Sequence, residues 1–326
     1  MRGVVAGLPR GRVSGWHAGA LILFWIALIA APVWLPAIGS YTDLGTRVLI
    51  YALAAMGLNL LLGFTGGLSF GHAAYFGLGA YGTGLFLRDV GQNDWLALLA
   101  GIFLGGMAAT IVGPLVMRRR GIYFAMITIA IGQMFYFVAV RWNSVTGGED
   151  GLAGFQRAPL GLPGGGVVPL SSTAFYYFVL ACFAIGVFVL ARILASPLGH
   201  SFVAVRENSR RLEFLGVRVG RLVWISFAIS GFITALAGSL DAMLNNFTSP
   251  PDLDWTLSGI FVILCVLGGM RSFWGPFLGA TIYVVMQNYV SSMTQNWMSV
   301  IGLMFMLVVL FFPRGLMGFV PRRRTA

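Results

Sequence analysis

Long apolar segments follow one another along almost the whole chain. Several approach or exceed the ~20 residues that a helix needs to cross a bilayer, and hydrophobic residues make up 58% of the sequence. The two short segments between 256 and 290 could form one tilted pair or a re-entrant feature, so we expect eight to ten crossings. The expected fold is an all-α polytopic membrane protein with about ten transmembrane helices, in a single transmembrane domain over residues 1–326. We place the segments near 18–36, 44–62, 69–87, 95–117, 121–140, 173–194, 222–244, 256–270, 273–290 and 297–313.

The absence of lysine limits the chemistry of the chain, because all 21 basic residues are arginine. A P-loop needs a lysine to reach the nucleotide phosphates, and Schiff-base catalysis also needs one. Cys182 and Cys265 lie inside apolar segments, and neither they nor the three histidines have the spacing of a metal site. We therefore expect no metal and no cofactor in this chain, and a separate polypeptide must hydrolyse any ATP that is used.

The arginines are distributed unevenly between the two faces of the expected membrane domain. Of the 21, only Arg47, Arg88, Arg141 and Arg157 fall outside when the N-terminus is placed inside. Arginine-rich loops stay in the cytoplasm, so we expect both termini to be cytoplasmic. The net charge of +11 then lies beside anionic lipid headgroups. This favours the lipid bilayer over nucleic acid as a partner. The basic N-terminus precedes a full-length apolar segment, which favours an uncleaved start over a removed signal peptide.

A polar, arginine-rich segment at 195–221 interrupts the apolar pattern. If it is helical, one face carries an apolar stripe. Glu207 precedes Arg210 and Arg211 by three and four residues, a spacing that favours ion pairs on a helix. Gly216 is a natural helix end. We interpret the segment as an amphipathic helix that docks on another protein. The stripe consists of Phe202, Val205, Leu212, Leu215 and Val219.

The longest loop on the opposite face is expected at 141–172. It is rich in glycine and proline, and Glu149 and Asp150 give it an acidic tip. Two interpretations stay open at this point, a solvated connector and a docking surface for an external partner, because long loops often carry function.

Residues Gly67 to Gly71 match the G-x-S-x-G pattern of hydrolases, with Ser69 at its centre. That pattern works at a strand-to-helix turn, whereas membrane helices flank it here. His72 is only three residues away on the same backbone, where we do not expect it to serve Ser69. An enzyme is therefore disfavoured.

A few uncharged polar residues lie inside the apolar segments. Asn59, Ser69 and Gln133 are candidates for lining a translocation path, although hydrogen bonding between helices is the favoured explanation for Asn59 and Gln133. Within these segments the one acidic side chain is Asp241, towards an outer end. A stand-alone, ion-coupled transporter usually carries ionisable groups at mid-membrane, so that class is also disfavoured.

Several motifs together resemble the LivM-like permease family of ABC importers for branched-chain amino acids. They occur in family order between about residues 44 and 316. The motifs are GLNLLLGFTGGLSFGH at 57–72, RGIYFA at 120–125, TGGEDGL at 146–152, SPLGH at 196–200, AVREN at 204–208 and LFFPRGL at 310–316.

The resemblance implies a type II-like importer permease in a bacterial inner (plasma) membrane. Its partners would be two cytoplasmic ABC ATPase subunits, which bind the ATP, a second homologous permease and a periplasmic substrate-binding protein. The same architecture also serves urea, short amides and aromatic acids, so the substrate stays open.

The resemblance also assigns roles to residues. Glu149 and Asp150 would contact the binding protein. The segment 195–221 would be the cytoplasmic coupling loop on the ATPase. The coupling residues would be Phe202, Val205, Leu212 and Leu215 in an ATPase groove, with Arg206, Glu207, Arg210 and Arg211 setting the register and Gly216 ending the helix.

Overall fold

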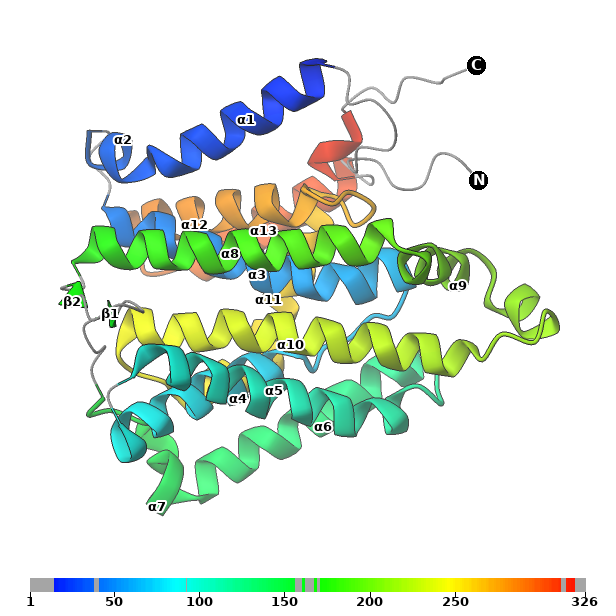
Figure 1. The fold of residues 1–326 in the computed structure, drawn as a ribbon, viewed down its shortest axis with the longest axis horizontal. Coiled ribbons are helices and arrows are strands. Elements are labelled where there is room, and N and C mark those ends of the chain that lie inside the picture. Colours follow the sequence, from blue (N-terminus) through cyan, green and yellow to red (C-terminus); the bar gives the residue numbers. More distant parts are fainter. Residues whose placement is uncertain are drawn as a thin grey trace.

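The computed structural model describes residues 15–37, 41–91, 93–155, 160–161, 167–168, 171–311 and 315–319. Parts of the expected loop at 141–172, Arg157 among them, and both terminal segments lie outside the described residues. The described chain is almost entirely helical, and one pair of two-residue strands joins antiparallel in it (Figure 1).

The helices follow one another in the order that the apolar segments predict. Each of the ten predicted segments contains a helix, which confirms the all-α fold. The first half contains α1 (Gly15–Ile29), α2 (Ala31–Ala37), α3 (Thr42–Asn59), the π-helix η1 (Leu60–Thr65), α4 (His72–Leu85), the π-helix η2 (Phe86–Val90), α5 (Asp94–Val116), α6 (Ile122–Arg141), α7 (Asn143–Thr146), and η3 (Gly148–Asp150). The second half contains β1 (Leu160–Gly161), β2 (Val167–Val168), α8 (Ser172–Ala195), α9 (Pro197–Phe214), α10 (Val219–Asn245), η4 (Pro250–Leu253), α11 (Trp255–Gly268), α12 (Gly275–Met293), α13 (Trp297–Phe311) and η5 (Leu316–Phe319).

Five of the described helices are long and apolar enough to cross a membrane unaided. They are α3 with η1, α5, α6, α8 and α10. Helix α9 lies at one end of this bundle (Figure 1), which we call the α9 end. Helix α10 starts there and finishes at the opposite end, which we call the far end.

Helix α10 is the centre of the fold, since it packs on α3, α4 and α5. Small residues allow the close approach, as their spacing in membrane helices indicates. A Cβ atom on Gly79 would overlap the Ala235 carbonyl, and one on Gly238 would overlap the Phe76 carbonyl. The Ser239 hydroxyl adds a hydrogen bond of 3.2 Å to the Gly79 carbonyl.

Helix α4 begins three residues later than the span expected at 69–87. Its 14 residues continue directly into the five of η2, and the resulting helix over 72–90 is about 28 Å long at 1.5 Å per residue, close to the hydrocarbon core of about 30 Å. Residues 66–71 before it are not helical and run from the α9 end into the middle of the bundle (Figure 1). Glycines in this segment explain the difference, because they favour turns and extended backbone over helix.

Helix α11 has only 14 residues. The Ser258 hydroxyl in its first turn accepts a hydrogen bond of 2.7 Å from the backbone N–H of Ala73, at the start of α4. The starts of α4 and α11 therefore meet, and the short segment expected at 256–270 is a short helix paired with the longer α12.

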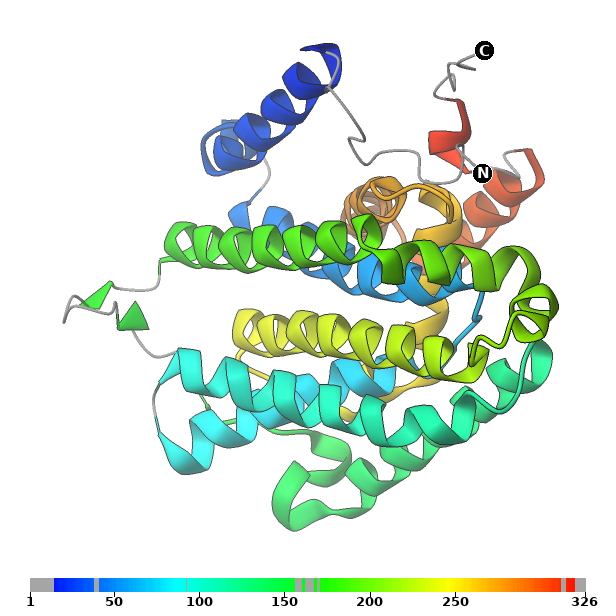
Figure 2. The same cartoon turned by 45° about the vertical axis from the view of Figure 1, so that its right-hand side comes forward.

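Helices α1 and α2 lie along the outside of the bundle beside α8 and α12 (Figures 1 and 2). The Phe24 ring contacts the rings of Trp274 and Phe277, with centroids 4.8 and 4.9 Å apart. The Tyr176 hydroxyl donates a hydrogen bond of 2.7 Å to the Leu28 carbonyl. Aromatic contacts thus attach α1 to the bundle.

Candidate functional site

Helix α9 is two helical segments joined at Asn208, whose φ of −157° and ψ of 89° are not helical. The Asn208 side-chain oxygen accepts a hydrogen bond of 2.9 Å from the backbone N–H of Arg211, so Asn208 caps the second segment. The break separates Glu207 from Arg210 and Arg211. No ion pair joins them in the described chain, and the expected pairing along one continuous helix is wrong.

The second segment of α9 ends at Gly216, as predicted. Gly216 has a φ of +78°, a conformation that favours glycine. The backbone N–H of Val217 donates to the Leu212 carbonyl and that of Gly216 to the Glu213 carbonyl, both at 3.0 Å. This pair of bonds is the Schellman motif of a helix C-terminus.

The predicted apolar stripe does not form one exposed surface, which corrects the docking face inferred from the sequence. Phe202 and Val205 are 0% and 6% exposed and pack into the core of this chain. Leu212 is partly buried beside Val205, whereas Leu215 is 73% exposed. Phe214, which sequence reasoning missed, is 89% exposed. The first segment therefore anchors α9, and the second presents apolar side chains to the surroundings.

Arg206 connects the first segment of α9 to the end of α3. Its guanidinium donates a hydrogen bond to the Gly63 carbonyl in η1. The C-terminal end of a helix carries partial negative charge, which favours a cation there. Burial lowers the pKa of the Arg206 side chain, and the nearby Arg271 lowers it further. The Gly63 carbonyl thus stabilises a partly desolvated cation.

Arg120 connects the second segment of α9 to the start of α6. It donates to the Ser209 hydroxyl, and to a Glu213 carboxylate oxygen at 2.5 Å. Sequence reasoning missed this contact because Arg120 and Glu213 are 93 positions apart. Both side chains are about half exposed, so the ion pair contributes at most about 1 kcal/mol. The contact matters because it fixes where α9 lies: with Arg206 bonded to Gly63, α9 is attached to both α3 and α6.

The non-helical segment 66–71 begins against α9 and ends in a buried hydrogen-bond network. A Cβ atom on Gly66 would lie 3.0 Å from the Arg206 side chain. At the other end, the Ser69 hydroxyl is 2.8 Å from Nδ1 of His72, and Nε2 of His72 is 2.7 Å from the Ser230 hydroxyl. Ser230 donates to the Gly57 carbonyl at 2.6 Å.

These distances assign a tautomer to His72. Because the Ser230 hydroxyl gives its proton to Gly57, it accepts from Nε2–H of His72. Nδ1 then accepts from the Ser69 hydroxyl. Ser69 and His72 do meet, contrary to the sequence argument, but both are completely buried. The network ties the start of α4 to α3 and α10, and Ser69 has no exposed surface for a substrate in this conformation.

Two more hydrogen bonds hold this region. The backbone N–H of Phe70 donates to the Thr128 hydroxyl of α6 at 3.2 Å, and Ala73 bonds to α11 as described above. The segment thus contacts α9 through Gly66 and α6 through Phe70, while the start of α4 that follows it is bonded to α10 and α11.

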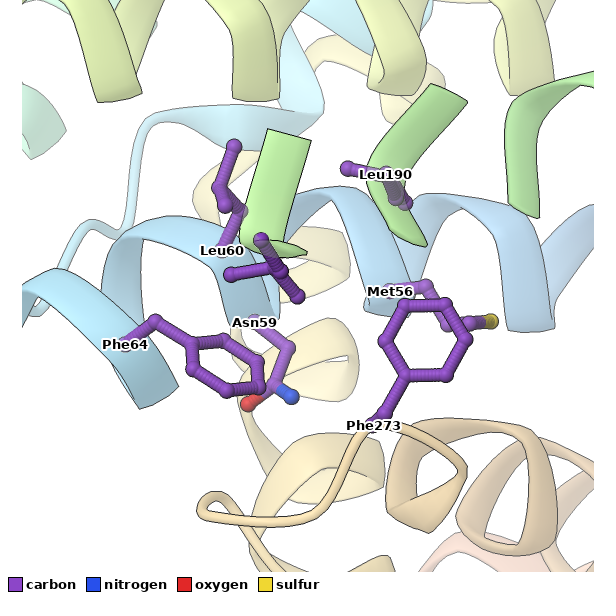
Figure 3. A pocket seen from close by; sticks show the side chains of 7 residues that line it. Met56, Asn59, Leu60, Phe64, Leu190 and Phe273 are labelled. Carbon is purple, nitrogen blue, oxygen red and sulfur yellow. The ribbon is translucent and has the colours of Figure 1, made fainter. Parts of the chain in front are cut away.

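Asn59 lines a small cavity between α3, α8 and the loop before α12 (Figure 3). Its side-chain N–H group donates to the Ser272 carbonyl at 3.0 Å. Ser272 lies in the loop between α11 and α12, so this bond joins a helix to a loop, whereas the sequence favours a bond between helices. The side-chain oxygen is buried and has no partner in the described chain. The cavity has room for about one water molecule. A role for Asn59 in translocation stays a prediction.

The remaining sequence-predicted residues lie away from α9. Gln133 donates a hydrogen bond of 2.7 Å to Asp254 and so joins α6 to the start of α11. Glu149 and Asp150 are exposed in η3 at the far end. The bridge between Leu152 and Thr248 holds that loop against the end of α10.

Comparisons with known proteins agree with this architecture. Residues 40–310 match the family described as branched-chain amino acid transport system / permease component. The high-affinity branched-chain amino acid transport system permease protein LivM of Salmonella typhimurium is 30% identical over 317 residues, covering 90% of this chain and 74% of that protein. The LivM protein of Escherichia coli is 28% identical with the same coverage. The LivH permease of Salmonella typhimurium is 23% identical over 82% of this chain and 91% of its own length.

No solved structure matches this chain. The family match nonetheless spans most of the sequence and includes α3 to α12, with α9 and the segment 66–71 among them. The chain therefore belongs to the permease family of branched-chain amino acid transport systems.

Proposed function

We propose that this permease subunit imports branched-chain or related amino acids from the periplasm to the cytoplasm by alternating access, driven by ATP. Two cytoplasmic ABC ATPase subunits, a second homologous permease and a periplasmic substrate-binding protein complete the transporter. It lies in a bacterial inner membrane with the α9 end and both termini in the cytoplasm. The names of the LivM and LivH relatives support the substrate class.

The observation that carries the proposal is the two-part construction of α9. The segment 195–221 is the coupling loop, and its first part is fixed in the core by Phe202 and Val205. Its second part offers Phe214 and Leu215 to a partner. Exposed apolar side chains next to charged ones are typical of interaction sites.

The ATPase therefore contacts the second segment of α9. Phe214 and Leu215 enter its groove, while Glu207, Arg210 and Arg211, all exposed, set the register. We call these five residues the docking set. In this proposal they bind the ATPase in place of the continuous apolar stripe that the sequence predicts.

Movement of α9 then reaches the translocation path through its two arginine contacts. Closure of the ATPase dimer displaces α9, and Arg206 and Arg120 pass the displacement to the ends of α3 and α6. Segment 66–71 moves with them and repositions the start of α4. Helix movements of this kind switch transporters between two discrete arrangements.

The far end faces the periplasm in this proposal. The loop at 141–172 meets the loaded binding protein there, with Glu149 and Asp150 as the contact residues. Both carboxylates are exposed, and the loop is held by backbone hydrogen bonds of 2.8 and 3.2 Å between Leu152 and Thr248. A fixed acidic surface suits a partner with complementary positive charge.

The test is the ATPase activity of the reconstituted transporter, measured with and without loaded binding protein. Leucine, isoleucine, valine, urea and an aromatic acid are compared as ligands. Stimulation by the branched-chain amino acids is expected. Stimulation by urea or an aromatic acid alone would contradict the substrate class, and failure to assemble with any ATPase would contradict the mechanism.

A further inference from the structure

A pocket of about 150 Å³ opens at the far end of the bundle. It lies between the first two turns of α3 and the last turn of α10. None of the residues that the sequence singles out for the translocation path lies in it. Its lining residues are Tyr41, Asp43, Leu44, Arg47, Leu244 and Asn245.

The Arg47 side chain on one wall of the pocket has only a weak hydrogen bond. The Arg47 guanidinium donates to the side-chain oxygen of Asn245 at 3.4 Å, which is long for such a bond. The Asn245 amide group donates in turn to the Asp241 carboxylate at 2.9 Å. Asp241 is 8% exposed. Arg47 itself is exposed, and this is the one hydrogen bond of its side chain in the described chain.

The Asp43 carboxylate, in contrast, lacks a hydrogen-bond donor in the described chain. One oxygen of its carboxylate is buried and has no hydrogen-bond partner among the described residues. A buried acceptor without a partner is unfavourable, so the Asp43 carboxylate gains by turning toward an N–H donor in the pocket that it lines. Tyr41 closes the pocket on the side of α12, where its hydroxyl donates to Asn288 at 2.7 Å.

The lining therefore combines one cation, one carboxylate that lacks a donor, and two leucines. An anion would be attracted by Arg47 but repelled by Asp43, and a cation would be attracted by Asp43 but repelled by Arg47. A zwitterion can place its negative group on Arg47 and its positive group on Asp43. The leucines, Leu44 and Leu244, suit an aliphatic side chain.

We propose that this pocket binds a zwitterionic aliphatic α-amino acid at the far end of the permease. Arg47 binds the carboxylate, Asp43 accepts hydrogen bonds from the ammonium group, and Leu44 and Leu244 contact the side chain. The assignment rests on the proposed function and makes this pocket the entry site of the imported molecule.

Thiol labelling tests the assignment on the full-length chain in nanodiscs. Leu244→Cys places a reporter in the pocket, and Tyr41→Cys provides a second one should the first fail to fold. The native Cys182 and Cys265 are buried, so a polar maleimide reports on the introduced thiol. Its rate is measured with L-leucine, with the α-keto acid of leucine, which lacks the ammonium group, and with isoamylamine, which lacks the carboxylate.

We expect L-leucine at ten times its Kd to slow labelling about tenfold, as simple occupancy requires. The keto acid and the amine should not protect. Arg47→Gln and Asp43→Asn should each abolish protection by L-leucine. The assignment is overturned if L-leucine does not protect either reporter, or if the keto acid or the amine protects equally well.

A parallel measurement separates this assignment from the proposed function. ATP-dependent uptake is measured after the same protein is reconstituted with its partner subunits. Uptake without thiol protection overturns the pocket and leaves the importer function standing. Protection without any ATP-dependent amino-acid uptake supports the pocket and overturns the importer function.

Discussion

The guanidinium of Arg206 in α9 donates a hydrogen bond to the backbone carbonyl of Gly63. Gly63 lies in η1, the π-helical continuation of α3. The two residues are 143 positions apart. Gly66, three residues further on, lies against the same arginine side chain. A single contact thus joins the proposed ATPase-binding element to the segment that enters the centre of the bundle.

Replacing Arg206 should uncouple ATP hydrolysis from transport. A hydrogen bond from a charged donor contributes about 1.5–3 kcal/mol, so Arg206→Ala should lower uptake about tenfold or more at normal membrane insertion. ATPase activity should fall less than uptake. Uptake and ATP hydrolysis are measured in the same proteoliposomes. Arg192→Ala, at an exposed position in α8 outside the coupling loop, is the control and should behave as wild type; equal behaviour of the two variants would contradict the coupling role.

A charge at position 214 should weaken the ATPase complex. Phe214 is 89% exposed and its substitution leaves the core intact, while burying a carboxylate in an apolar groove is strongly unfavourable. Phe214→Glu should therefore reduce co-purification of the ATPase subunits about tenfold or more, whereas Phe214→Leu keeps an apolar contact and should retain the complex. Normal ATPase binding by Phe214→Glu would refute the docking set.

Phe202 should behave in the opposite way. It is completely buried, and removing a buried aromatic ring costs about 3–5 kcal/mol. Phe202→Ala should lower the thermal unfolding temperature in detergent, and Leu215→Ala should not. Fluorescence-detected unfolding of the two variants checks this. If the Phe202→Ala protein were as stable as wild type but did not bind the ATPase, Phe202 would be a docking residue, as the apolar stripe in the sequence predicts.

Ser69→Ala distinguishes a structural serine from a nucleophile. The substitution leaves Nδ1 of His72 without its donor, which costs about 1–3 kcal/mol of stability. Uptake per folded transporter should be unchanged, because the bonds from Phe70 to Thr128 and from Ala73 to Ser258 still hold the segment and the start of α4. Uptake is normalised to the amount of protein that elutes as a folded complex. Abolished uptake with unchanged stability would point to chemistry at Ser69 instead.

Much of the fold is predictable because its signals are local. The hydrocarbon thickness sets the length of a spanning segment, so the ten apolar segments could be placed, although the helix in one of them, α11, is shorter than a full span. Gly216 marks the end of α9 because positive φ favours glycine wherever it occurs. Gly101 and Gly105 indicate close packing by their spacing alone, and in the structure Gly101 lies against Gly79 and Ser239.

The break at Asn208 was not predicted, since the apolar spacing continues through it from Phe202 to Leu212. A signal was nevertheless present. Asparagine is among the preferred residues at a helix N-terminus, and Asn208 lies three residues before the backbone N–H that it caps. Weighing this preference against periodicity places the break at Asn208.

The buried network could not be predicted from the sequence. Its hydrogen bond between His72 and Ser230 spans 158 positions, and no local pattern links them. Similarly, Arg47 and Asn245 are 198 positions apart and meet only because α3 and α10 pack side by side. Contacts of this kind depend on tertiary packing.

Site-specific photocrosslinking tests the central claim most directly. A photoreactive phenylalanine analogue is placed at Phe214, at the α9 end, and separately at Asp150, at the far end, in the assembled transporter. Mass spectrometry identifies the crosslinked partner. The account predicts an ABC ATPase subunit at position 214 and the substrate-binding protein at position 150. An ATPase crosslinked at position 150, or none at position 214, would contradict it.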